Sequence, residues 1–293
     1  MAVGLIKRVW RSRSILHKKI WMKIVSPRRF VGSERYTSVF QGCMGLEIGG
    51  PSGIFRDAGL LPLYKDVGGL DVCNFADTTM WEGKISSGDN FFYHPLKRPG
   101  HQYIADTTDL SEIASGKYDF ILASHVLEHV ANPLKALSEW IRVTKTAGYL
   151  LIILPHKQYT FDWRRPVTKL EHLVDDFACG VGEDDLTHLD EILTLHDLAR
   201  DPDVDGPEAF KQRSLNNVRN RGLHQHVFDT ALAVQMLDYS GLQILAVDTV
   251  LPFHVIILSR KVDKNTLIDN SEFLAPDAAF RTRSPFSIDR LIR

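Results

Sequence analysis

The chain has 293 residues, of which 44% are hydrophobic and 24% are charged, and its formal net charge is −1. This size allows one large hydrophobic core, and the near-neutral charge argues against a nucleic-acid partner, which usually requires a basic domain. Because the three cysteines lack disulfide-like or metal-like spacing and no apolar run is as long as a membrane span, a cytoplasmic location is expected.

Residues 1–36 form a distinct basic arm. No acidic residue precedes Glu34, and Lys and Arg interleave there with Leu, Ile, Val and Trp. On a helix the apolar side chains would fall near one face with basic flanks, as in helices that lie on anionic membranes. Residues 1–30 are therefore predicted either to contact a membrane peripherally or to pack on the protein's own core. A mitochondrial transit peptide is a third option.

The segment GLEIGGPSGIF, residues 45–55, predicts a short strand that ends in Glu47 and a glycine-rich turn with Gly49, Gly50 and Gly53. Glycines in the turn after the first strand of an open α/β sheet let the backbone approach a nucleotide-like ligand closely. The spacing is Glu-x-Gly-x-x-x-Gly rather than Gly-x-Gly-x-x-Gly. This difference favours a ligand without a pyrophosphate.

A second strand is predicted at residues 61–64, and an acid that binds a ribose should follow it. Asp66 and Asp71 both qualify, and Asp71 is preferred because it lies nearer the spacing of about twenty residues from the glycine motif. Either carboxylate could instead cap a turn, since two glycines lie between them.

The next elements alternate between strands and one clear helix. Residues 103–110 predict a strand that ends at Asp106, and residues 118–130 give an apolar strand that breaks at Ser124 and leads into a helix. Asn132 is expected to cap a helix that stops at Gly148, and Asp229 can cap a helix that ends at Gly241. The wholly apolar residues 149–155 are typical of a strand buried on both faces.

This order of elements resembles the small-molecule, type-11-like branch of the class I S-adenosylmethionine-dependent methyltransferases, over residues 43–156 and again from about 224. The resemblance implies an α/β fold with a Rossmann-like, seven-stranded, mostly parallel sheet, closed by an antiparallel pair at 242–250 and 253–260. It also implies S-adenosylmethionine as cofactor. The residues that it implies for cofactor binding are Glu47, Gly49, Gly50, Gly53, Asp71 or Asp66, Asp106 and Ser124.

Histidines indicate the chemistry. His125, Glu128 and His129 stand at i, i+3 and i+4, so a helix would bring them to one face beside the cofactor cleft. An imidazole titrates near neutrality and can accept the proton of an attacking hydroxyl. His125 or His129 is therefore the predicted general base, with Glu128 beside it, for methyl transfer to a hydroxyl of a small molecule, glycan or lipid-linked substrate.

A metal-assisted reaction is the alternative for the same residues. The ubiquinone-pathway O-methyltransferases and the enzymes that methylate the 2′-hydroxyl at small-RNA 3′ ends have Glu-x-x-Glu-His at the matching place, where the metal grips vicinal hydroxyls. Here the segment reads HVLEH, so His125 replaces the first glutamate. By the same resemblance, His226 would be the fourth metal ligand and His224 its alternate. The metal-free enzyme is the preferred prediction, and a non-catalytic cofactor-binding protein is a second alternative.

Residues 156–223 form an insert that the resemblance does not require, and we expect a helical cover over the substrate. The core then comprises residues 37–155 and 224–261, and residues 262–293 should be an irregular tail. Paired arginines at 164 and 165 would suit a phosphate or carboxylate, or would pair with acids of the insert. His188 and His196 are expected on the solvated face of a helix. The residues predicted to face the substrate are His156, Arg164, His172 and His226.

Overall fold

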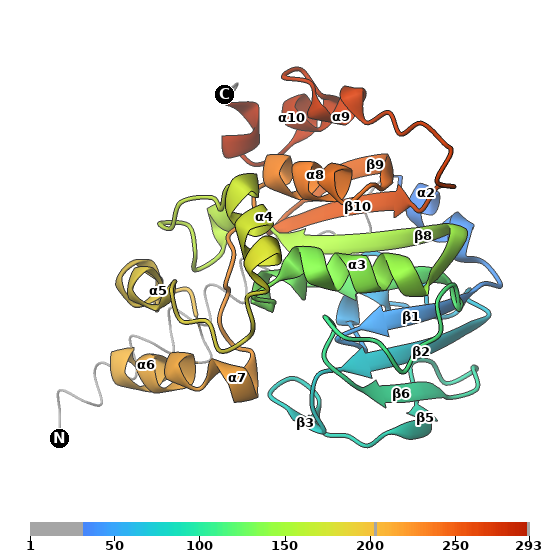
Figure 1. Ribbon diagram of the computed structural model, residues 1–293, viewed down its shortest axis with the longest axis horizontal. Helices are drawn as coiled ribbons and strands as arrows, with labels where there is room; N and C mark the ends of the chain where they lie inside the picture. The colour runs from blue at the N-terminus through green and yellow to red at the C-terminus, as the bar shows by residue number, and fades with distance from the viewer. Residues whose placement is uncertain (1–31, 202–203, 292–293) are drawn as a thin grey trace.

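The fold is built around one twisted sheet, seen in a computed structural model that describes residues 32–201 and 204–291. Its strands lie in the order β5-β6-β2-β1-β7-β8-β10-β9 (Figure 1). The sheet thus has eight strands rather than the expected seven, because β5 adds a strand at the edge beyond β6. The arm at residues 1–30, which was predicted to contact a membrane or the core, lies outside the described residues.

Five neighbouring strands are parallel: β1 (Met44–Ile48), β2 (Gly69–Asn74), β6 (Gly100–Ile104), β7 (Tyr118–Ser124) and β8 (Thr144–Pro155). The antiparallel strands are β5 (Gly88–Phe91), β9 (Gln243–Val250) and β10 (His254–Arg260). The expected antiparallel pair at the C-terminal side of the sheet is therefore confirmed. A small hairpin, β3 (Thr78–Thr79) and β4 (Gly83–Lys84), follows β2 in place of a helix.

Both faces of the sheet are buried, which explains the continuous apolar runs of β7 and β8. One face packs against α3 (Pro133–Val143) and α8 (Thr230–Tyr239), where Trp140 is fully buried and donates from Nε1 to the Thr107 hydroxyl at 2.6 Å. The other face is covered by apolar side chains from residues 36–67. The first of them, Tyr36, lies on the short helix α2 (Glu34–Thr37).

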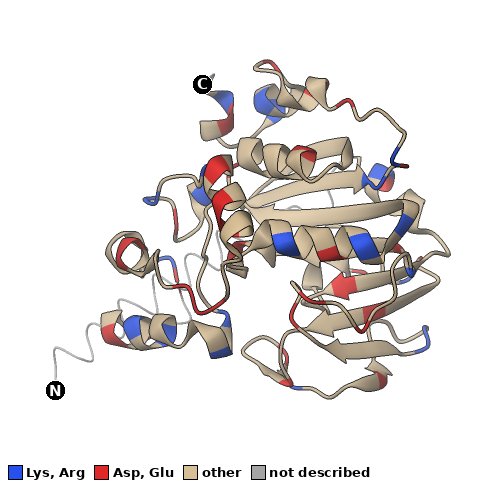
Figure 2. Ribbon diagram, in the orientation of Figure 1, with Lys and Arg blue, Asp and Glu red and all other residues tan. Residues whose placement is uncertain are grey.

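The capping residues act as the sequence indicated, whereas one helix end differs. The Asn132 side chain accepts a hydrogen bond from the Lys135 N–H at 3.0 Å and so caps α3. In the same way Asp229 caps α8. The helix α3 ends at Val143 and not near Gly148, because β8 already begins at the next residue. Charged side chains of both signs lie along the outer side of α3 (Figure 2).

The prediction of the second strand is wrong, and with it the placement of both aspartates. Residues 61–64 form a buried loop, and β2 begins only at Gly69. Asp71 therefore lies inside the strand, where its carboxylate accepts from the Tyr118 hydroxyl at 2.6 Å and from the His101 N–H at 2.8 Å. Asp66 lies in the turn that precedes β2. Neither is at the carboxyl end of the strand, where a ribose contact was expected.

The insert and the C-terminal residues carry most of the remaining helices. Residues 156–223 contain α4 (Leu170–Cys179), α5 (Leu189–Leu195), α6 (Pro207–Leu215) and α7 (Asn217–Asn220), on the left of Figure 1. The tail is not irregular as expected, since it forms α9 (Ser271–Leu274) and α10 (Ala279–Arg283) and buries Phe280 and Phe286. No helix in residues 32–201 or 204–291 is long and apolar enough to cross a bilayer.

Replacing Asp71 should destabilise the fold. Asp71→Ala leaves the buried Tyr118 hydroxyl and the His101 N–H without their acceptor, so we expect a loss of about 2–4 kcal/mol in the free energy of unfolding. Urea denaturation measures it. Asp66→Ala, in the partly exposed turn, is the matched control and should change stability by less than about 0.5 kcal/mol. Equal effects of the two substitutions would contradict this account of Asp71.

Candidate functional site

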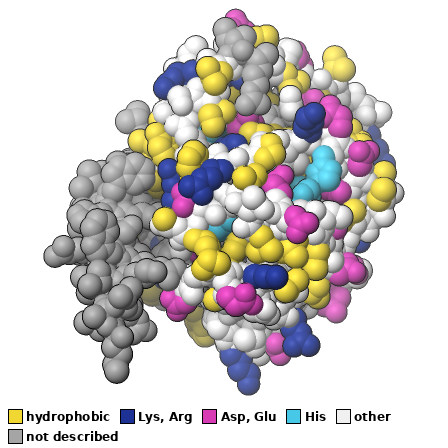
Figure 3. Space-filling view, turned by 90° about the vertical axis from the view of Figure 1, so that its left-hand side faces the viewer, with side chains coloured by type: hydrophobic (Ala, Val, Ile, Leu, Met, Phe, Trp, Pro, Cys, Tyr) yellow, Lys and Arg dark blue, Asp and Glu magenta, His cyan; other side chains and the backbone are white. Residues whose placement is uncertain are grey.

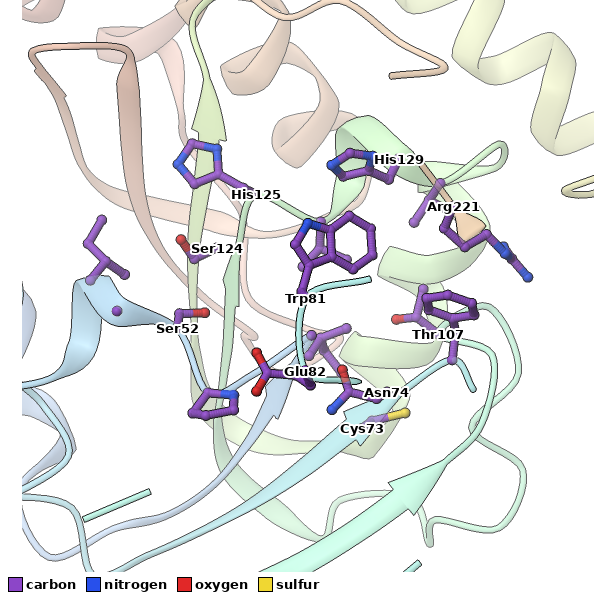
Figure 4. A pocket seen from close by; sticks show the side chains of 18 of the residues that line it. Ser52, Cys73, Asn74, Trp81, Glu82, Thr107, Ser124, His125, His129 and Arg221 are labelled. Carbon is purple, nitrogen blue, oxygen red and sulfur yellow. The ribbon is translucent and has the colours of Figure 1, made fainter. Parts of the chain in front are cut away.

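A cavity of about 580 Å³ opens at the carboxyl ends of β1, β2, β6 and β7 (Figure 4). From β1 the chain extends the sheet through β2 and β6 on one side and through β7 and β8 on the other. Such a switch point leaves a crevice between loops that diverge, and this is where open α/β sheets bind ligands. The volume lies within the range of roughly 300–1,000 Å³ that is typical of cofactor and small-molecule sites.

The glycine-rich loop after β1 forms one wall of the cavity. Gly49 lines it with φ of 71°, and a Cβ there would lie 3.0 Å from Val126 Cγ2. Gly53 also lines the cavity, and a Cβ at that position would have no protein atom within 4 Å. Gly50 faces inward, where a Cβ would lie 2.3 Å from the Glu47 carboxyl carbon. Side chains at Gly49 and Gly50 would therefore disturb the cradle that brings the backbone close to a ligand.

Glu47 supports this loop from beneath. Its side chain is fully buried and is not among the residues that line the cavity. Oε1 accepts from the Ser52 N–H at 2.9 Å, and Oε2 accepts from the Tyr64 hydroxyl at 2.8 Å. Burial raises the pKa of Glu47 to about 7 despite these hydrogen bonds. Glu47 thus holds the loop in shape, and its position differs from the predicted direct contact with the cofactor.

Polar side chains stand at three strand ends. Asp106, after β6, and Ser124, at the end of β7, line the cavity where the sequence predicted them. Asn74, at the end of β2, occupies the place where an aspartate was expected, and its side-chain N–H donates to the Gly50 carbonyl at 3.0 Å. Burial would raise the pKa of Asp106, but hydrogen bonds from Thr108 and the nearby Arg221 lower it overall.

Several cavity residues were not found from the sequence. Trp81 and Glu82 lie between the two strands of the β3–β4 hairpin and reach the cavity, where the Trp81 ring is 5.3 Å from that of His129 (Figure 4). Arg221, at the end of the insert, donates to Asp106 at 2.7 Å. A tryptophan in the polar stretch 76–84 was the only local signal for the hairpin. The sequence around Arg221 gave no local signal for its place in the cavity, because that place depends on how the insert folds back.

The HVLEH segment is not helical at its start, contrary to the prediction. His125 has φ of 56°, and Leu127–His129 makes a single 3₁₀ turn. The three side chains nevertheless converge, with His125 Nδ1 3.4 Å and His129 Nε2 4.0 Å from Glu128 Oε1. Both histidines line the cavity, whereas Glu128 lies behind them with 1% of its surface exposed.

Each histidine has a second partner. His125 Nε2 lies 3.0 Å from Nδ1 of His254, which also lines the cavity. His129 donates from Nδ1 to the Leu223 carbonyl at 2.9 Å, which leaves a lone pair on Nε2. Burial, more than any other cause, lowers the pKa of His129 to about 4. His129 is therefore neutral at pH 7.

A third histidine completes a cluster behind the cavity wall. Ligand atoms of Glu128, His129 and His224 all lie within 4.8 Å of one another. His224 Nδ1 lies 2.5 Å from the Asp162 carboxylate, so its other ring nitrogen is available to the cluster. This donor set of two imidazoles and a carboxylate could hold a divalent ion. The cluster contains His224, which was predicted as the alternate fourth metal ligand. It does not contain His226, which was the preferred one.

None of the four residues predicted to face the substrate lines the cavity. His156 is fully buried, stacks on Phe286 with 4.0 Å between ring centres, and lies 3.2 Å from Asp289. Arg164 is half exposed over the Trp163 ring. His172 and His226 belong to another cluster, described below. The C-terminal tail packs on the start of the insert and diverts His156 from the cavity.

One family model matches most of the chain. A family model described as a methyltransferase domain matches residues 40–247. No curated protein gave a significant match. A solved S-adenosylmethionine-dependent methyltransferase from Aquifex aeolicus is 16% identical, with 79% of this chain and 90% of that chain covered and a TM-score of 0.37. One from Mesorhizobium loti is 12% identical, with coverage of 78% and 95% and a TM-score of 0.45.

A pH-dependent stability difference should reveal the buried Glu47 carboxyl. Its pKa is raised from the ordinary 4.5 to about 7 in the folded protein, so its contribution is fully present below pH 4.5 and is lost as pH rises through 7. Glu47→Gln removes this titration but keeps an acceptor for Ser52. The stability of the native chain relative to that of Glu47→Gln should therefore fall by about 3 kcal/mol between pH 4 and pH 8.

Urea denaturation of both proteins across this pH range is the measurement. Glu47→Ala serves as the comparison, because it leaves the Ser52 N–H unpaired and should be less stable than Glu47→Gln by about 1–3 kcal/mol. A pH-independent difference between the native chain and Glu47→Gln would show that Glu47 titrates normally.

Proposed function

Since this chain belongs to the methyltransferase domain family and is an S-adenosylmethionine-dependent methyltransferase, we propose that it methylates a hydroxyl group. His125 is the general base. The acceptor is a hydroxyl of a small molecule, glycan or lipid-linked substrate. The cradle formed by the loop at Gly49 fits the cofactor, because the backbone there is open to the cavity and a Cβ would crowd Val126.

The contact between Glu128 and His125 carries this proposal. Glu128 is almost completely buried, and burial would raise its pKa, but the hydrogen bond from His125 and the neighbouring imidazoles lower it overall. The carboxylate is therefore ionised at neutral pH. It holds a proton on His125 Nδ1 at 3.4 Å and so directs the lone pair of the ring to Nε2.

His125 and His254 together provide the path for the proton. Both line the cavity, and 3.0 Å separates His125 Nε2 from His254 Nδ1. Because His125 Nδ1 holds its proton, His254 Nδ1–H donates to His125 Nε2. A proton that His254 Nε2 takes from the substrate hydroxyl can therefore be relayed through this hydrogen bond to His125, while Glu128 balances its charge. S-Adenosylmethionine supplies a methyl group bonded to a positively charged sulfur. The histidines would remove the proton of the hydroxyl, so that its oxygen could take this methyl group, and the electron pair of the methyl–sulfur bond would stay on sulfur.

Metal-assisted O-methylation is the second candidate, and one observation favours it. Glu128 Oε2 is buried without a hydrogen-bond partner among the described residues. Nδ1 of His129 and Nδ1 of His224 are already engaged by a carbonyl and a carboxylate, so their remaining nitrogens could bind an ion together with the Glu128 carboxylate. A divalent ion held by these three residues would lower the pKa of a hydroxyl bound to it.

Removing His125 should reduce turnover and leave cofactor binding intact. We expect His125→Ala to lower kcat by roughly 10²–10⁴, the usual contribution of a general base, with an unchanged Kd for S-adenosylmethionine. His101→Ala is the matched control, because His101 is partly exposed on β6 beside Asp89 and does not line the cavity. Label from a methyl-labelled cofactor would be followed into a metabolite extract, and the product bond identified by NMR. A labelled methyl group on nitrogen or carbon would refute the hydroxyl proposal.

The same assay separates the base from the metal. If His125 acts alone as base, His224→Ala should keep kcat within about tenfold of the native value, because His224 does not line the cavity. If an ion is held by Glu128, His129 and His224, then His224→Ala should be as damaging as Glu128→Gln. We expect the first pattern. Comparable losses in the two variants would favour the metal-assisted reaction.

A further inference from the structure

Three histidines from separate parts of the sequence meet away from the cavity. His172 lies on α4, His188 directly precedes α5, and His226 lies in the segment that leads into α8. One nitrogen of each lies within 4.8 Å of the others, and His172 Nε2 and His188 Nε2 are 2.9 Å apart. None of the three lines the cavity. We call these residues the insert histidine cluster.

His226 has a buried nitrogen without a partner. The residue is 1% exposed, and its Nε2 lies 3.1 Å from the Ala131 carbonyl, which can only accept a hydrogen bond. Nε2 therefore carries the proton, and Nδ1 of the neutral ring has a lone pair. Nδ1 is buried and has no hydrogen-bond partner among the described residues. A buried acceptor that stays unpaired is unfavourable, so the cluster is poised for a cation.

We propose that the insert histidine cluster binds a divalent transition-metal ion, with zinc the best match. Three imidazoles suit Zn²⁺, and in a tetrahedral site with Zn–N of about 2.0–2.1 Å the ligand atoms lie about 3.3 Å apart. The separation of 2.9 Å between His172 and His188 is close to that value. The Ala131 carbonyl fixes the His226 ring through Nε2, as hydrogen-bond partners of metal-bound histidines usually do.

Asp176 lies beside the insert histidine cluster. Its Oδ2 lies 3.4 Å from His172 Nε2 and 3.7 Å from His226 Nε2, the ring nitrogen that donates to Ala131. The Asp176 backbone is anchored as well, since its carbonyl accepts from the Asn132 side chain at 2.9 Å. A carboxylate beside three imidazoles compensates part of the charge of a divalent ion. Figure 3, which shows the face at the left of Figure 1, has histidine and acidic side chains next to one another on the surface.

The insert has a physical need for such an ion. Apart from α4, whose Leu173 packs into the main core, the buried apolar cluster of the insert consists of Ile192, Val204, Phe210 and Leu223. A core of this size gives little stability, and small units commonly rely on a metal or a disulfide. The ion would connect α4, the start of α5 and the segment before α8, and would thereby close two long loops.

The ion would also position one wall of the cavity. The His226 N–H donates to the Glu128 carbonyl at 3.4 Å, and its ring donates to Ala131. Both carbonyls belong to the segment that presents His125 and His129 to the cavity. The role of the ion is therefore structural, and it is distinct from any ion held by Glu128, His129 and His224.

Metal binding by the full chain tests the proposal. Protein dialysed against a chelator would be titrated with Zn²⁺ by calorimetry, and Co²⁺ would report tetrahedral coordination through its visible absorption. We expect tight binding of Zn²⁺, a raised melting temperature, and no competition from Mg²⁺, which prefers oxygen ligands. His172→Ala and His188→Ala should each weaken this binding at least about 100-fold. His101→Ala and Glu128→Gln should retain it.

Hydrogen exchange of the native chain makes the test independent of variant stability. Zn²⁺ should slow exchange in α4, around His188 and in residues 224–228. The proposal is overturned if the native chain binds no Zn²⁺, if both alanine variants bind it as the native chain does, or if bound Zn²⁺ leaves exchange in these segments unchanged. Loss of all Zn²⁺ binding in Glu128→Gln would also overturn it, because the ion would then belong to the cavity.

Discussion

Burial of a parallel sheet on both faces is the constraint on which the rest of this structure depends. Within the strands almost every side chain must be apolar or must have polar partners, as Asp71 has in Tyr118 and the His101 N–H. Polar groups that are free to meet a ligand are therefore confined to the strand ends. Because the parallel strands point the same way, Asn74, Asp106 and Ser124 collect at one edge and form the cavity.

Glu128 and Glu47 show how two buried carboxylates of one cavity differ in charge. Glu47 has only uncharged hydrogen-bond donors, so burial dominates and its pKa rises. Around Glu128 the imidazoles offset burial, and its pKa falls. The first carboxyl group holds a loop in shape, and the second is an ionised group behind the histidines. We infer that this difference in surroundings separates a supporting role from a catalytic one.

The end of the insert and the residues just after it contact the wall of the cavity. Arg221, near the end of the insert, reaches Asp106, and the Leu223 carbonyl fixes His129. Just after the insert, the His226 N–H holds the turn at Glu128. The proposed ion at the insert histidine cluster would stabilise this arrangement at the place where the insert has few apolar contacts of its own.

The sequence by itself determined the elements whose signals are local. Apolar runs predicted β7 and β8, the caps at Asn132 and Asp229 predicted two helix starts, and the glycine pattern placed the loop after β1. Burial periodicity and capping act over a few residues, so one stretch of sequence records them. The second strand was misplaced because the apolar residues 61–64 outweighed a true strand that contains a buried aspartate.

Only the tertiary structure decided which distant groups meet. The choice of His224 over His226 beside Glu128 and the entry of Trp81 into the cavity depend on the path of loops. Arg221 meets Asp106 across 115 positions, and His156 meets Asp289 across 133 positions. A histidine has the same local pattern whether it binds a carbonyl, a carboxylate or an ion. Its partner is fixed only when the chain folds, because the free energy of burying an imidazole depends on what surrounds it.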